Sequence, residues 1–146
     1  MSVRYAEDLC PGTERDLGSY RLTRNELIEF AERWDPQSFH VDASASGYFG
    51  DVIASGAHTL AIFQRLSVLS DESHWAVIAG VGLRDVRFLA PVRPDVELRG
   101  RSRVESVDLE PERRRGLVTK RGALFAGDTQ VLDLTSAAYV RMRAAR

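Results

Sequence analysis

The chain has 146 residues, 44% of them hydrophobic, which suits one domain with a buried core. Its 20 Lys and Arg residues are balanced by 21 Asp and Glu residues, and this near-neutral charge argues against a nucleic-acid-binding protein. The single cysteine, Cys10, can form neither an internal disulfide nor a cysteine metal cluster.

The N-terminal segment is polar and acidic, unlike a signal peptide, and no apolar run approaches the roughly 20 residues that span a membrane. We therefore expect a soluble cytoplasmic protein without a membrane partner. Pro11-Gly12 indicates a turn, and residues 1–16 are expected to form an irregular N-terminal segment. The whole chain, residues 1–146, is interpreted as a single domain.

A first helix is predicted from Thr23, because residues 23–26 (TRNE) have the pattern of a capping box. Thr23 would cap the first turn, and Glu26 would reach back to the Thr23 amide. Apolar residues then follow at helical spacing as far as Trp34. Pro36 should end the helix, because the residue before a proline is pushed out of the helical region. Asp35 is therefore expected at the helix exit.

A second helix is predicted over residues 55–70, with Ser55 as its cap. Apolar residues lie nearly all round this helix, which is typical of a buried helix. The intervening residues, 36–55, are expected to form a long connection. This connection should contain a short helical turn over residues 43–46, capped by Asp42.

Four strands are predicted in the second half of the chain. The last is the clearest, because apolar and more polar residues alternate from Leu132 to Met142. Helices followed by consecutive strands predict an α+β domain, in which an antiparallel sheet packs against a buried helix. The strands are expected within residues 76–91, 95–109, 116–127 and 129–142.

Three short stretches carry a resemblance to a known family: WDPQSFHVD (34–42), ASG (54–56) and FLAPV (88–92). They resemble the MaoC-like dehydratases, the (R)-specific enoyl-CoA hydratase family. That family has a D-x-N-P-x-H-x-D motif, a small residue and a glycine at the start of its central helix, and an F-x-x-P-V strand. The resemblance implies a hot-dog fold, with a long central helix wrapped by a curved antiparallel β-sheet.

Asp35, His40 and Asp42 stand at the acidic and histidine positions of that motif, and Gln37 stands at the asparagine position. The resemblance implies a hydro-lyase that interconverts a 2-enoyl thioester, such as an enoyl-CoA, and the (3R)-hydroxyacyl thioester. Such an enzyme needs no metal and no redox cofactor. The family pairs two domains side by side, so we expect a homodimer or a multiple of it.

Hydration of an enoyl thioester needs a base for water, an acid for C2, and a donor to the thioester oxygen. Asp35 and His40 suit the acid–base roles. Ser55 and Gly56 suit an oxyanion or substrate-binding role, because helix N-terminal amides are unpaired and glycine admits a close ligand. From the residues alone, a capping Asp35, an ordinary loop histidine and a plain helix cap remain open.

The other polar candidates are expected to be structural. His58 lies one turn inside the second helix and should pack or hydrogen-bond the loop, His74 should lie in an exposed connection, and Asp42 should cap a turn. Arginine binds phosphates well, so several arginines are candidates for the coenzyme A phosphates. These are Arg84, Arg87, Arg93, Arg99, Arg101 and Arg113-Arg114-Arg115.

Two other functions remain open. An acyl-CoA thioesterase can share the fold, and such enzymes often place an acidic residue on the central helix. Residues 56–70 contain no Asp or Glu, which disfavours hydrolysis. A non-catalytic acyl-thioester-binding subunit is compatible with Gln37 in the motif, whereas the presence of both Asp35 and His40 favours an enzyme.

Overall fold

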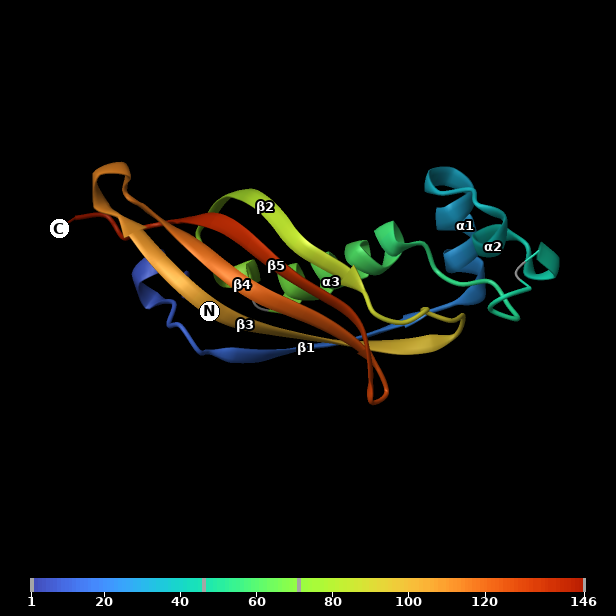
Figure 1. Ribbon diagram of the computed structural model, residues 1–146. Helices are drawn as coiled ribbons and strands as arrows, with labels where there is room; N and C mark the ends of the chain where they lie inside the picture. Colours follow the sequence, from blue (N-terminus) through green and yellow to red (C-terminus); the bar gives the residue numbers. More distant parts are fainter. Residues whose placement is uncertain (1, 46, 71, 146) are drawn as a thin grey trace.

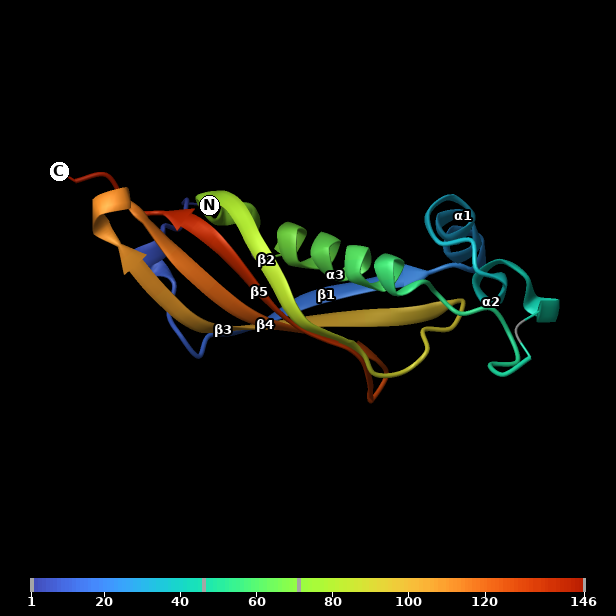
Figure 2. The same cartoon turned by 45° about the horizontal axis from the view of Figure 1, so that its top comes forward.

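A single curved antiparallel sheet and one long helix make up the body of the molecule. The computed structural model describes residues 2–45, 47–70 and 72–145. The strand order is β1-β3-β4-β5-β2, and helix α3 (Gly56–Ser70) lies along one face of the sheet, as Figures 1 and 2 show. The α+β hot-dog architecture is thereby confirmed. The strands are β1 (Glu14–Leu22), β2 (Val77–Phe88), β3 (Val96–Glu110), β4 (Arg115–Ala126) and β5 (Thr129–Arg141).

Two shorter helices stand at one end of the sheet. Helices α1 (Arg24–Trp34) and α2 (Ser38–Val41) gather there with the beginning of α3, and the C-terminus lies at the opposite end (Figure 1). Short 3₁₀ turns complete the description: Ala6–Asp8, Ala43–Ala45, Glu72–His74 and Pro111–Arg113. The turn predicted over residues 43–46 is found at 43–45, and residue 46 lies outside the described residues.

Helix α1 begins and ends where the sequence predicts. The Glu26 amide donates to Thr23 Oγ1 at 3.3 Å, and Asp35 is the C-terminal cap next to Pro36. The second half of the predicted capping box is wrong. The hydroxyl of Tyr20, a residue of β1, donates instead to the Glu26 carboxylate, at 2.8 and 2.9 Å from its two oxygens.

Strand β1 was not predicted, and it begins at Glu14, within the segment expected to be irregular. The predicted turn at Pro11-Gly12 is present just before it. The strand lacks a clear alternation, because only Leu17 and Leu22 are buried in it. A register shift between Asp16 and Gly18 against β3 interrupts the period of two on which strand prediction relies.

Helix α3 buries only one of its sides, so the prediction that it is buried nearly all round is wrong. Ile62, Phe63 and Leu66 face the sheet and belong to the main core cluster. The opposite side exposes Ala57, Ala61, Val68 and Leu69. A single sheet layer can cover one side of a helix, and the other side is left for something else.

The close approach of α3 to the sheet depends on a glycine in β4. The ring of Phe63 lies where a Cβ of Gly122 would be, so any side chain at position 122 would overlap this ring. Phe63 is fully buried, and its neighbours in the core leave it little room to move. Gly122 therefore sets the distance between helix and sheet.

We expect Gly122→Ala to lower the free energy of unfolding by about 1–3 kcal/mol, because an overpacked core must shift its side chains. Urea titration at neutral pH would measure the difference. Gly80→Ala on β2 is the matched control, since a Cβ there meets nothing within 4 Å. Equal stabilities for the two variants would contradict this account of the helix position.

Candidate active site

The fold brings Asp35 and His40 together. Nε2 of His40 lies 3.2 Å from Oδ2 of Asp35. Asp35 caps the C-terminus of α1, where its amide donates to the Ala31 carbonyl at 2.8 Å. His40 lies on α2, a single turn of helix inside the stretch predicted to be a connection. The two groups therefore come from adjacent helix ends that Pro36 separates.

The hydrogen bonds of His40 fix which ring nitrogen faces Asp35. His40 is buried, and its Nδ1 lies 2.6 Å from the carbonyl oxygen of Ile53. A carbonyl oxygen can only accept, so Nδ1 must carry a hydrogen and donate it. The Ile53 amide in turn donates to the Phe39 carbonyl at 3.1 Å, which fastens α2 to the chain beside it.

This arrangement leaves one proton for the pair to share. With Nδ1 protonated, Nε2 of a neutral imidazole is an acceptor, and both oxygens of an ionised carboxylate are acceptors too. Two acceptors 3.2 Å apart repel each other unless a proton lies on one of them. The contact between Nε2 and Oδ2 is therefore favourable when the pair holds one exchangeable proton.

Three side chains hold the Asp35 carboxylate. The Ser55 hydroxyl donates to Oδ2 at 2.7 Å, and the Gln37 amide nitrogen donates to Oδ1 at 2.8 Å. The hydrogen bond from Ser55, then that from Gln37, and the neighbouring His40 lower the pKa of Asp35. The negative end of the α1 dipole disfavours a carboxylate here, and the adjacent N-terminus of α3 offsets it.

Ser55 and Gly56 lie at the start of α3, as predicted. The Ser55 hydroxyl bonds Asp35 and accepts the Ala57 amide at 3.3 Å, so this side chain supports the carboxylate and caps the helix. The ring of Phe88 approaches to 2.7 Å of where a Cβ of Gly56 would be. The space that the sequence assigned to a ligand is thus partly taken by Phe88. A substrate-binding role for the two residues stays a prediction.

The pair opens into a largely apolar cavity of about 620 Å³. That volume falls within the range of small-molecule sites, roughly 300–1,000 Å³. Apolar walls with a few polar groups at one place suit a ligand that has an apolar part next to a polar, reacting group. The cavity is lined by Asp35, Gln37, His40 and Gly56 together with Trp34, Phe49, Phe88 and Leu89.

The remaining polar candidates lie apart from the pair. His58 is buried in α3, and its ring stacks on Phe30 of α1 with centroids 4.3 Å apart. Burial lowers the pKa of His58, so the ring favours its neutral form. It holds α1 against α3, which fits the structural role expected of it. Asp42 accepts from the Ser44 amide at 2.9 Å and caps the following turn, as predicted.

Three of the eight arginines predicted to bind phosphate contact other groups of the protein. Arg99 pairs with Asp16 at 2.8 Å, and Arg115 pairs with Glu110 at 2.6 Å. Arg93 donates to the Phe49 carbonyl at 2.8 Å and so fastens a loop that lines the cavity.

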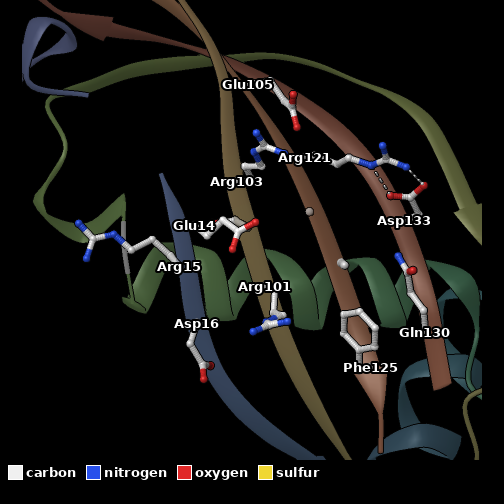
Figure 3. A pocket seen from close by; sticks show the side chains of 13 residues that line it. Glu14, Arg15, Asp16, Arg101, Arg103, Glu105, Arg121, Phe125, Gln130 and Asp133 are labelled. Carbon is white, nitrogen blue, oxygen red and sulfur yellow. Dashed lines mark hydrogen bonds and ion pairs between the residues drawn. The ribbon is translucent and has the colours of Figure 1, made fainter. Parts of the chain in front are cut away.

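Figure 3 shows a second hollow, of about 530 Å³, on the outer face of the sheet. Helix α3 passes behind the strands in that view, so this is the face of the sheet that the helix does not cover. Positive and negative side chains alternate there, and Arg121 pairs with Asp133 at 2.9 Å. The hollow is a solvated, charge-balanced surface. Its charged residues are Arg15, Arg101, Arg103 and Arg121 with Glu14, Asp16, Glu105 and Asp133.

The site combines a histidine and a carboxylate in contact at the edge of an apolar cavity. Such a pair has the groups that general acid–base chemistry needs. In the part of the chain that the structure describes, no helix is long and apolar enough to cross a membrane.

Comparison with known proteins assigns the family. The MaoC like domain model matches residues 8–123, and the chain belongs to this family. It is 34% identical over 125 residues to the uncharacterized protein YdeM of Bacillus subtilis (strain 168), covering 78% of this chain and 87% of that protein. Among solved structures it is similar to a MaoC-like dehydratase from Rhodospirillum rubrum, with 31% identity and a TM-score of 0.88. That match covers 97% of this chain and 99% of the other.

An R-hydratase, PhaJ1 from Pseudomonas aeruginosa, shares the fold at 21% identity, with a TM-score of 0.73. The match covers 95% of this chain and 86% of the R-hydratase. At the level of the family, the domain match and the similarity to the Rhodospirillum rubrum dehydratase support a hydratase or dehydratase.

Removal of the Ser55 hydroxyl should raise the pKa of Asp35, because that hydrogen bond is the largest contribution that lowers it. We expect Ser55→Ala to move the Asp35 titration to higher pH, as followed by NMR of its carboxyl carbon. Ser44→Ala is the matched control, because it removes a hydroxyl that donates to Asp42 instead. That control should raise the pKa of Asp42 and leave Asp35 unchanged. An unchanged Asp35 in Ser55→Ala would contradict the support role.

Proposed function

We propose that this protein is a hydro-lyase that adds water to a 2-enoyl thioester, such as an enoyl-CoA, and catalyses the reverse dehydration. The product is the (3R)-hydroxyacyl thioester. The observation that carries the proposal is the contact of Asp35 Oδ2 with His40 Nε2 at the wall of an apolar cavity. Membership of a hydratase and dehydratase family supports the same reaction class.

The shared proton gives the pair both halves of the chemistry. A water molecule bound between Asp35 and His40 would lose a proton to the unprotonated member as its oxygen attacks C3. The member that carries the proton would deliver it to C2. Water is thereby added across the double bond, and the pair holds one proton before and after the reaction. Dehydration follows the same steps in reverse.

Negative charge on the thioester oxygen needs a fixed donor during this addition. The amide of Gly56 is the first of α3, and the first amides of a helix have no acceptor within the helix. The positive end of the α3 dipole adds to its effect. Gly56 would therefore bind the enolate oxygen, while the ring of Phe88 against it limits how the thioester can enter.

The proposal predicts a large and shared effect of the two side chains on turnover. Asp35→Asn keeps the shape of the side chain but removes its charge, and it should lower the hydration rate by roughly 10²–10⁴. His40→Gln should do the same, and the double variant should be little worse, because groups that act on one water act as a unit. Rates would be measured with a panel of enoyl-CoA esters.

The same assay separates the competing functions. Asp42→Asn is the matched control, because Asp42 is exposed and caps a turn, and it should keep the wild-type rate. Thiol release measured in parallel would reveal thioester hydrolysis, and chiral analysis should find the (3R) product. A folded Asp35→Asn variant that hydrates within a few-fold of wild type would sink the catalytic assignment.

We further propose that the protein assembles as a homodimer or a multiple of it. β2 lies at an edge of the sheet, paired with β5 on one side. Five large apolar side chains of this strand are exposed: Val77, Ile78, Val81, Leu83 and Phe88. An exposed apolar edge strand is a ready template for another chain. A second copy paired along β2 would cover it.

Light scattering at micromolar concentration should therefore give at least twice the mass of the chain, and Ile78→Lys should shift the protein toward monomer. The charge would have to be buried in the paired interface, which is unfavourable. Leu109→Lys is the control, since it places the same charge at an exposed apolar position that lies outside β2, near the end of β3 before the Pro111–Arg113 turn. A monomeric wild-type protein would remove this proposal.

A further inference from the structure

A hollow of about 390 Å³ lies farther along α3, between that helix and strands β2 and β5, beside the edge of β2 where a second copy is proposed to pair. Its walls are unusually mixed. Gly80, Gly82 and Ala138 leave space over the strands, whereas Gln64, Glu72, Trp75 and Lys120 bring polar atoms to it. It differs in this respect from the cavity beside Asp35, whose walls are mainly apolar.

The polar wall is built around a buried lysine. The side chain of Lys120, on β4, is only 4% exposed. Its ammonium donates to the Ser67 hydroxyl at 2.9 Å, forms an ion pair with Glu72, and lies 5.0 Å from the centroid of the Trp75 ring. A buried ammonium is tolerated when it is paired and hydrogen-bonded, so Glu72 neutralises the site.

Two N–H donors of this cluster still lack an acceptor among the described residues. An ammonium has three N–H groups, and those of Lys120 bond Ser67 and Glu72 within the part of the chain that the structure describes. Trp75 is 7% exposed, and its indole Nε1 has no hydrogen-bond partner among these residues. Buried donors are rarely left unpaired, so we expect an acceptor oxygen of a bound molecule in this hollow.

The hollow and the catalytic cavity share the same two walls. Ala57 lines the cavity of the pair, Gln64 lines the hollow, and exposed Ala61 lies between them. Their spacing of four and three residues puts all three on one face of α3. On the opposite wall, Phe88 of β2 lines the cavity and Leu83 of the same strand lines the hollow.

From Gly56 to Gln64, α3 rises about 12 Å at 1.5 Å per residue, and its exposed face over this stretch carries Ala57 and Ala61. A chain attached to a thioester at Gly56 could follow small alanine side chains to the polar cluster. Its near part would contact apolar walls, and its far end would meet the two donors.

We infer that the cluster of Gln64, Trp75 and Lys120 binds an uncharged oxygen, a hydroxyl or a carbonyl, on the distal part of the acyl group. The inference rests on the proposed function, since it takes the acyl group to be anchored at Gly56. An uncharged oxygen is preferred to a carboxylate, because Glu72 already neutralises Lys120 and would repel a second negative charge.

Binding of saturated acyl-CoA thioesters, which cannot be hydrated, tests this site without relying on turnover. Matched pairs of equal length, long enough to span the path, would end in a methyl, a hydroxyl, a ketone or a carboxylate. Calorimetry on the wild-type protein should show the hydroxyl or ketone tail binding roughly 10-fold tighter than the methyl tail, as one added hydrogen bond allows.

Variants locate the preference. Trp75→Phe removes the indole N–H, and Gln64→Leu removes the amide from an exposed helix position; each should reduce the preference several-fold and leave the methyl tail bound as before. Arg65→Leu is the control, because its side chain lies near Tyr20 on another side of α3. Since Lys120→Met alone leaves Glu72 unpaired, the double variant Lys120→Met/Glu72→Met tests the lysine in a neutral background.

The outcomes separate this inference from the proposed function. A preference for the uncharged oxygen that disappears in Trp75→Phe supports the site, even if no hydration is found. Hydration without any tail preference overturns the inference and leaves the hydro-lyase intact. Tightest binding of the carboxylate tail, or no binding of any thioester by the wild-type protein, also overturns it.

Discussion

The hydrogen bond from the Ser55 hydroxyl to Asp35 Oδ2, 2.7 Å long, joins two helix ends that lie 20 residues apart in the sequence. Asp35 caps the end of α1, where a negative charge is disfavoured, and Ser55 caps the start of α3, where it is favoured. Without this bond, the carboxylate would keep only Gln37 and His40 as partners. With it, one oxygen of Asp35 is placed for His40.

The support continues through the buried backbone that precedes α3. Ile53 accepts from His40 Nδ1 through its carbonyl and donates to the Phe39 carbonyl through its amide, so one residue orients both the imidazole and α2. The next amide, of Ala54, donates to the Val92 carbonyl at 2.9 Å. This ties the site to the chain that follows β2. Asp35 and His40 are therefore held in place by hydrogen bonds from Ser55 and to Ile53, and Ala54 anchors the chain that carries Ser55 and Ile53.

The sequence predicted the elements that have strong local signals. Pro36 stops α1, Ser55 caps α3, and alternation from Leu132 marks β5; each signal acts within a few residues. Helix α2 was not predicted because four residues are too few to show a period. Strand β1 was not predicted because the register shift at Gly18 disturbs the alternation of buried and exposed residues.

The site divides along the same line. Asp35 and His40 were predicted from their motif, and their contact is present. Ser55 bonds Asp35 across 20 residues of sequence, and Ile53 bonds His40 across 13. No local sequence pattern relates these atoms. The ring of Phe88 against Gly56 is more distant still in sequence. Such contacts arise from tertiary packing, and only the fold discloses them.

The exposed side of α3 shows what an apolar count misses. A helix with apolar residues nearly all round is expected to be buried, yet its small residues, Ala57 and Ala61, and its large ones, Phe63 and Leu66, lie on different sides. Large side chains fill the space against the sheet, because a packed core needs volume. Small alanine side chains on the other side leave that face open beside Asp35 and His40. Over residues 57–66, side-chain size rather than hydrophobicity separates the face that packs on the sheet from the face that is free to contact a ligand or a second copy. Farther along the helix, the larger Val68 and Leu69 are exposed as well.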